Sequence, residues 1–101
     1  RAVAKGLEYN LTLDWLLPRL MGGHCEATGL PFDMSAPQKG YTVNPWSPSL
    51  HREDTTRGYT PDNTFLVCSA FNQARGQWPK EIFDKLVINY IGEEIGEDTI
   101  Y

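Results

Sequence analysis

The side chains with the clearest capacity for chemistry lie between residues 51 and 72. His51 stands next to Arg52, acids occupy the two positions after that, and Asn63 and Asn72 follow, nine positions apart. A neutral imidazole can take a proton near pH 7, and carboxylate and amide oxygens are hard ligands that suit Mg²⁺. The types of these residues indicate acid–base or metal-assisted chemistry.

Strand geometry decides which of these side chains can face each other. Residues 49–54 are expected to form a strand, in which successive side chains point to opposite faces. His51 and Glu53 then share one face, and Arg52 and Asp54 share the other. The pattern favours Glu53 over Asp54 as the carboxylate beside His51.

The elements from residue 49 onward are expected in the order strand, loop, strand, helix, helix. Turn formers fill residues 55–63 and a second strand is expected over 64–68, which together predict a β-hairpin with a long loop. Helix formers fill residues 70–77, and a last helix is expected to begin at residues 78–79 and to end before Gly92. The apolar residues at helical spacing in that last helix are Ile82, Phe83, Leu86, Val87 and Tyr90.

The first half of the chain is expected to contain helices and a long irregular segment. A short helix is predicted over residues 2–9, and a second one has Thr12 as its N-cap and ends at Gly22. Pro18 lies inside that second helix and is expected to kink it or to confine its regular part to one side. Glycine and proline then break up residues 24–48 into an ordered loop region.

Length and charge bound the classes of function. A chain of 101 residues, 41% hydrophobic and 22% charged, predicts a single α+β domain over residues 1–101. The net charge of −4 excludes a strongly basic, indiscriminate binder of polyanions, although six of the thirteen acids follow residue 80. No apolar run approaches the roughly 20 residues that span a bilayer. We therefore expect no membrane partner and a cytoplasmic location.

Four stretches of the chain resemble the HNH family of endonucleases, and especially its phage-type members. The resemblance covers about residues 11–78, with the core motif at about 25–78. The spacing from Asn63 to Asn72 is similar to the family's separation between a central Asn and a metal-binding residue on the following helix. The stretches that carry the resemblance are Cys25-Glu26-Ala27-Thr28-Gly29, Pro48-Ser49-Leu50-His51-Arg52-Glu53-Asp54, Gly58-Tyr59-Thr60-Pro61-Asp62-Asn63-Thr64-Phe65-Leu66-Val67-Cys68 and Phe71-Asn72.

The resemblance implies a ββα-metal fold, in which a hairpin and the following helix surround one divalent ion, Mg²⁺ or Mn²⁺. Helices at the N- and C-terminal ends would flank this α+β core. The implied activity is that of a metal-dependent endonuclease that hydrolyses phosphodiester bonds in DNA. Such a nuclease is expected to be encoded by a phage or prophage and to act in the bacterial host cell, alone, as a homodimer or within a larger polypeptide.

Individual roles follow from the matched positions. The resemblance implies that His51 and Asn72 hold the metal and that Asn63 braces the loop between the strands. His51, Arg52 and Asn63 are accordingly the expected catalytic group. The cationic side chains expected to contact nucleic acid are Arg52, Arg57 and Arg75.

The strand-one pair departs from the family pattern. His51 falls where the family has its metal-binding Asp, and Arg52 falls where it has its general base, a role that a permanently protonated guanidinium cannot fill. In one interpretation His51 is the base or a nitrogen ligand, Arg52 holds the phosphate, and Glu53 or Asp54 supplies a carboxylate. In the other, the module is catalytically degenerate and binds nucleic acid or a protein partner without cutting. A third interpretation is a structural protein whose acidic segment 93–98 docks a basic partner.

The two cysteines mark a second departure. Many relatives build a zinc site from two Cys-x-x-Cys pairs, whereas here Cys25 is paired with Thr28, and Cys68 with Phe71. Two thiolates do not complete a tetrahedral site, so we expect no structural zinc. The resemblance would leave Cys25 and Cys68 close in space, as packed thiols or, under oxidation, as a disulfide.

Overall fold

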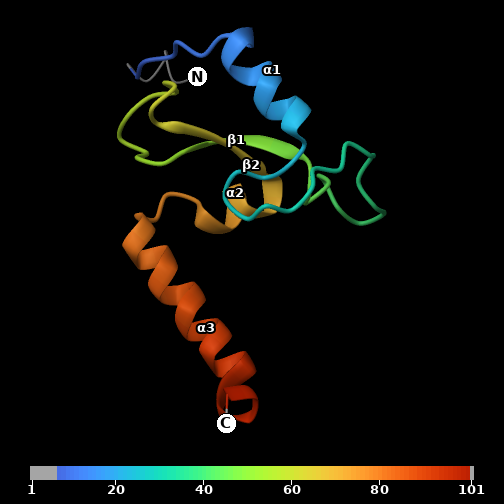
Figure 1. Cartoon of the computed structure of the whole chain (residues 1–101), viewed down its shortest axis with the longest axis vertical. Helices are drawn as coiled ribbons and strands as arrows, with labels where there is room; N and C mark the ends of the chain where they lie inside the picture. Colours follow the sequence, from blue (N-terminus) through green and yellow to red (C-terminus); the bar gives the residue numbers. More distant parts are fainter. Residues whose placement is uncertain (1–6, 101) are drawn as a thin grey trace.

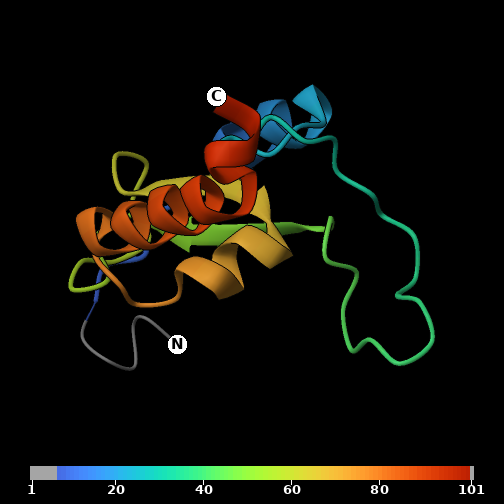
Figure 2. The ribbon, with the colours of Figure 1, turned by 90° about the horizontal axis from the view of Figure 1, so that it is seen from below.

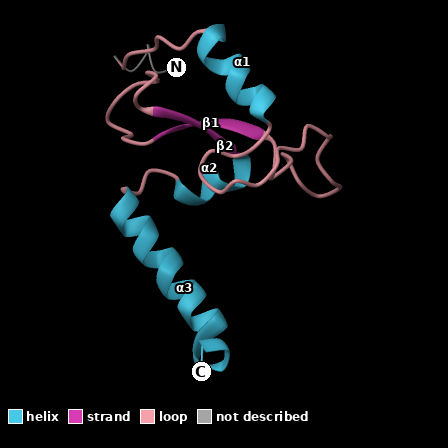
Figure 3. Cartoon of the chain, viewed as in Figure 1, coloured by secondary structure: helices cyan, strands magenta, loops and turns pink. Residues whose placement is uncertain are grey.

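The structure is a computed structural model that describes the backbone of residues 7–100 and the side chains of residues 7–92. It is an α+β arrangement of one two-stranded antiparallel sheet and helices, which confirms the predicted class (Figure 1, Figure 3). The elements are α1 (Leu13–Gly22), β1 (Pro48–Arg52), β2 (Thr64–Cys68), α2 (Ser69–Arg75) and α3 (Lys80–Ile100).

The register of the hairpin fixes which side chains share a face. Leu50 lies opposite Leu66, and His51 lies opposite Phe65. Directly paired residues point to the same face of an antiparallel pair, so the leucine pair and the His51–Phe65 pair face opposite ways. In Figure 1, α1 lies on one side of the hairpin and α2 on the other. Because His51 bonds to residues of α2, its face is the one that α2 covers.

Helix α1 begins as the sequence predicts. Thr12 is extended and its Oγ1 accepts a hydrogen bond from the backbone N–H of Trp15 at 3.2 Å, as an N-cap does. The helix continues through Pro18 and ends where Gly23 adopts a left-handed φ of 76°. Trp15 is buried and anchors α1 over the hairpin.

The small core joins the hairpin to the irregular segment before it. Cys25, Val67 and Cys68 form its buried centre, and Phe71 of α2 packs against them. Both cysteines are free thiols, as expected. Burial raises the pKa of Cys68, which keeps it protonated at neutral pH. The loop that precedes β1 projects beyond the end of the hairpin in Figure 2.

The loop between β1 and β2 is closed by one buried asparagine. The side chain of Asn63, 1% exposed, accepts a hydrogen bond from Asp54 N and donates to the carbonyl oxygens of Asp54 and Gly58. On its outer side the loop meets the N-terminal segment, where Tyr59 N donates to Glu8 O at 2.9 Å. Asn63 thus braces this loop, as the resemblance implied.

We predict that replacing Gly58 by alanine destabilises this loop. A Cβ at this position would collide with the backbone of Glu8, so Gly58→Ala must push the N-terminal segment away and break its bonds to Tyr59. We expect a loss of about 1–3 kcal/mol in the free energy of unfolding, measured by urea titration. The matched control is Gly92→Ala, whose Cβ meets nothing within 4 Å and which should leave stability unchanged or raise it. Equal stability of the two variants would contradict the close approach.

Several expected boundaries differ from the structure. Residues 7–9 of the helix predicted over 2–9 are not helical, because Tyr9 pairs as a bridge with Tyr59; residues 2–6 lie outside the described part. The first strand ends at Arg52 instead of residue 54, since Asp54 Oδ1 accepts from Thr56 N and starts a turn. The helix predicted over 70–77 spans Ser69–Arg75. The last helix begins at Lys80 instead of residue 78 or 79 and continues past Gly92 to Ile100.

Helix α3 leaves the body of the domain in Figure 1. Near its start, the ring of Phe83 meets that of Phe71 edge-on, with 5.7 Å between the ring centroids. In the part of the chain that is described, α3 and the shorter helices lack the combination of length and apolar character needed to cross a membrane.

Candidate active site

His51 is the centre of the candidate site. Its side chain is 3% exposed and points from the penultimate position of β1 toward α2. The ring nitrogen Nδ1 lies 3.2 Å from Oδ1 of Asn72, the residue with which it was expected to share a metal. The hairpin–helix unit therefore brings together two side chains that are 21 residues apart.

The amide of Asn72 is held in one orientation. Its Nδ2 donates to Ser49 Oγ at 2.8 Å and to Leu50 O at 3.0 Å, which turns Oδ1 toward His51. Asn72 is the fourth residue of α2 and Cys68 occupies the N-cap position, so Asn72 does not cap the helix. The oxygen Oδ1 of Asn72 can only accept a hydrogen bond. Without an ion, Nδ1 of His51 must therefore carry the ring proton, and the lone pair lies on Nε2.

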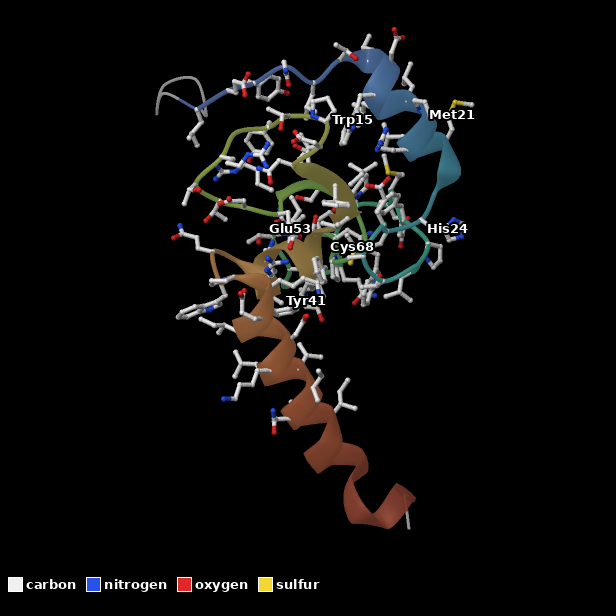
Figure 4. The ribbon with its side chains drawn as sticks, turned by 60° about the vertical axis from the view of Figure 1, so that its left-hand side comes forward. Trp15, Met21, His24, Tyr41, Glu53 and Cys68 are labelled. Carbon is white, nitrogen blue, oxygen red and sulfur yellow. The ribbon has the colours of Figure 1, made fainter. Side chains whose placement is uncertain are left out.

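Arg75 and Glu53 complete the group on the Nε2 side. Arg75 is 3% exposed; its NH2 lies 3.2 Å from Glu53 Oε2 and its NH1 lies 3.4 Å from His51 Nε2. The Oε1 atom of Glu53 is 3.8 Å from the same ring nitrogen. This confirms the prediction that Glu53 shares a face with His51. Figure 4 shows Glu53 at the junction of the hairpin and α2, and His24 at the outer edge of the molecule.

The surroundings keep the imidazole neutral. Burial lowers the pKa of His51 below its ordinary value, and the Arg75 guanidinium acts in the same direction. The bond to Asn72 and the charge of Glu53 offset only part of this effect on the pKa. At pH 7 the ring is therefore neutral, and the lone pair of Nε2 faces Arg75 NH1.

This pKa shift gives a direct prediction. The folded His51 ring should titrate below about pH 6.5, the value of an unperturbed histidine. An unfolded chain then binds the proton more readily, so the free energy of unfolding should fall as the pH drops through 6.5 toward the folded pKa. NMR titration of the imidazole signals, assigned with a His24→Gln variant, measures the midpoint. A midpoint at or above 6.5 would contradict the burial argument.

The donor atoms present are compatible with a divalent ion. Adjacent ligands of an octahedral ion with bonds of 2.0–2.1 Å lie about 3 Å apart, close to the 3.2 Å between His51 Nδ1 and Asn72 Oδ1. A histidine that gives Nδ1 to a metal carries its proton on Nε2 and usually donates it to a carboxylate, and Glu53 lies on that side. No cluster of three His, Cys, Asp or Glu side chains that could hold a metal ion occurs among the described residues.

The other two arginines are engaged away from His51. Arg52 donates to the carbonyl oxygens of Thr55 and Arg57 and lies over the ring of Tyr59. Arg57 is exposed and paired with Asp62 at 2.8 Å. Of the three arginines expected to contact nucleic acid, Arg75 is the one that the fold places beside His51.

A pocket beside the site had no counterpart in the sequence analysis. It has a volume of about 470 Å³, and its lining includes His51, Glu53 and Arg75 together with Phe65, Phe71 and Phe83. The alternation of residues in β2 places Phe65 on the same face as Val67, but the partner of Phe65 depends on the hairpin register. The pattern of residues in the sequence could not predict that three phenylalanine rings line one pocket.

Comparison with known proteins identifies no relative whose site could be compared with this one. No protein-family model, curated protein or solved structure matches the chain.

Proposed function

We propose that this domain is a metal-dependent endonuclease of the HNH, or ββα-metal, type that hydrolyses phosphodiester bonds in DNA. The observation that carries the proposal is the 3.2 Å contact between the buried His51 and the oriented amide of Asn72 across the hairpin–helix unit. We further propose a phage or prophage origin and action in the bacterial cytoplasm, alone, as a homodimer or within a larger polypeptide.

Four side chains would divide the work. His51 and Asn72 would hold a divalent ion, which supplies charge neutralisation at the phosphate and at the leaving oxygen. Arg75 would bind a phosphate oxygen, because guanidinium groups make strong charge-assisted hydrogen bonds to phosphate. Glu53, whose Oε1 lies 3.8 Å from His51 Nε2, would accept the proton of the attacking water once Arg75 turns to the substrate.

The choice of ion follows from the donor atoms. Mg²⁺ prefers oxygen ligands, whereas Mn²⁺ also accepts imidazole nitrogen. Cleavage of supercoiled plasmid should therefore be faster with Mn²⁺ than with Mg²⁺ and should stop in EDTA. Failure to cut with any divalent ion would contradict the proposed activity.

Restoring the family residue should reverse this preference. His51→Asp replaces a neutral nitrogen by a carboxylate oxygen, which raises the negative charge of the site and suits Mg²⁺. We expect the ratio of the Mg²⁺ rate to the Mn²⁺ rate to rise by about tenfold or more, on the scale of other changes at metal sites. An unchanged ratio in a folded variant would show that residue 51 does not bind the ion.

A second candidate function is nucleic-acid or protein binding without cleavage. The observation that favours it is the position of Arg52, which stands where the family has its base and is bound to the carbonyl oxygens of its own loop. The plasmid assay separates the candidates, since a binding module would retain DNA at low salt and leave it intact.

A further inference from the structure

The pocket next to His51 combines an open mouth with an aromatic wall. Its volume of about 470 Å³ falls within the range of roughly 300–1,000 Å³ found for pockets that hold small molecules. The hairpin supplies one side of it, and α2 and the start of α3 supply the other. The buried His51 and Arg75 lie at its polar end.

Phe65 offers a flat apolar surface in the lining of the pocket. It lies opposite His51 in the hairpin register and is 41% exposed, although its neighbours in β2 are buried. Its ring is therefore available to a ligand that enters the pocket.

Two further rings are fixed behind it. Phe71 meets His51 edge-on with 5.7 Å between centroids, and Phe83 meets Phe71 in the same way at the same distance. The chain of rings leads from the site toward α3. A planar ligand between Phe65 and these rings would have aromatic neighbours and would reach His51.

The charges around the pocket are balanced. Each acid that lines it is paired with a base: Glu53 with Arg75, Asp84 with Lys80, and Glu26 with Arg19. The interior thus suits an uncharged planar group and offers few free acceptors to select among such groups.

We propose that this pocket holds one unstacked nucleobase, with the phosphate of the same nucleotide directed to His51 and Arg75. This inference rests on the proposed function and specifies its substrate as single-stranded or locally unpaired nucleic acid. A base within a duplex is stacked and paired, so it cannot enter such a pocket without being turned out. Because stacking on an aromatic ring accepts every base, sequence preference should be weak.

Binding in EDTA tests the proposal without cleavage. The probes are a fluorescein-labelled 12-residue oligothymidylate and a blunt duplex of the same length, followed by anisotropy. The wild-type domain should bind the single strand at least about tenfold more tightly than the duplex. Phe65→Ala should weaken single-strand binding by about tenfold, within the range found when stacking platforms are removed, and leave duplex binding unchanged.

Two control variants test whether the effect of Phe65→Ala comes from the loss of an aromatic ring in the pocket. Phe65→Trp keeps a stacking surface and should retain single-strand binding. Tyr41→Ala removes an aromatic side chain that is 57% exposed outside the pocket and should change neither affinity. Equal single-strand affinity of Phe65→Ala and wild type, duplex binding as tight as single-strand binding, or no binding of either probe would each overturn the proposal.

The plasmid assay separates this inference from the proposed activity. A domain that cuts plasmid while Phe65→Ala binds single strands normally has the nuclease activity but lacks the base pocket. A domain that cuts neither the plasmid nor a single-stranded DNA circle with Mn²⁺, while Phe65→Ala loses single-strand binding, has the pocket but lacks the nuclease activity.

Discussion

His51→Ala should reduce the rate of plasmid cleavage with Mn²⁺ by on the order of 100-fold or more. Loss of an outer-shell partner of a metal ligand typically costs 10–100-fold in affinity or activity, and loss of the ligand itself should cost no less. The substitution also removes the partner of Asn72 Oδ1 and of Arg75 NH1. Initial rates at a fixed Mn²⁺ concentration measure the effect.

The chain contains a matched control for this substitution. His24 is its other histidine; it is exposed, and its Nδ1 contacts the carbonyl oxygen of Gly22 away from the site. His24→Ala should cleave plasmid at the wild-type rate. A similar loss in both variants, or normal cutting by a folded His51→Ala, would contradict the assignment of the site.

Asn63→Ala should have the largest effect on stability. Three hydrogen bonds of a buried side chain would be lost, leaving the Asp54 N–H and two carbonyl oxygens without their partner. At about 1 kcal/mol for each bond, with a further contribution from the cavity, we expect a loss of about 3 kcal/mol or more in the free energy of unfolding. The thermal midpoint should fall by about 10 °C or more.

An exposed asparagine provides the comparison. Asn89 lies on α3 and its side chain donates only to Lys85 O, one turn earlier. Asn89→Ala should change stability by less than about 0.5 kcal/mol, as surface substitutions usually do. If Asn63→Ala were equally mild, the loop would not depend on the asparagine that closes it.

Local sequence signals predicted the elements that local chemistry determines. The cap at Thr12 and the strand over residues 64–68 are confirmed, because each depends on neighbours in sequence. The expected proximity of Glu53 to His51 is also confirmed, although β1 ends at Arg52 and Glu53 lies just after the strand.

The features that the sequence did not predict depend on contacts between distant segments. Arg75 was expected at a nucleic-acid surface but lies buried beside His51 and Glu53, because α2 folds back onto the hairpin. Residues 7–9 are not helical, because Tyr9 forms an isolated β-bridge with Tyr59, which is distant in sequence. Partners so far apart leave no periodic signal in the chain.

The claim that His51 and Asn72 share one divalent ion can be tested by NMR of the two histidine side chains. Substoichiometric Mn²⁺ is paramagnetic and broadens the signals of nuclei close to it. We expect the ring signals of His51 to broaden first, those of His24 to persist, and Asn72→Ala to abolish the selective effect. Broadening of His24 alone, equal broadening of both rings, or an undiminished effect in Asn72→Ala would contradict a metal site at His51 and Asn72.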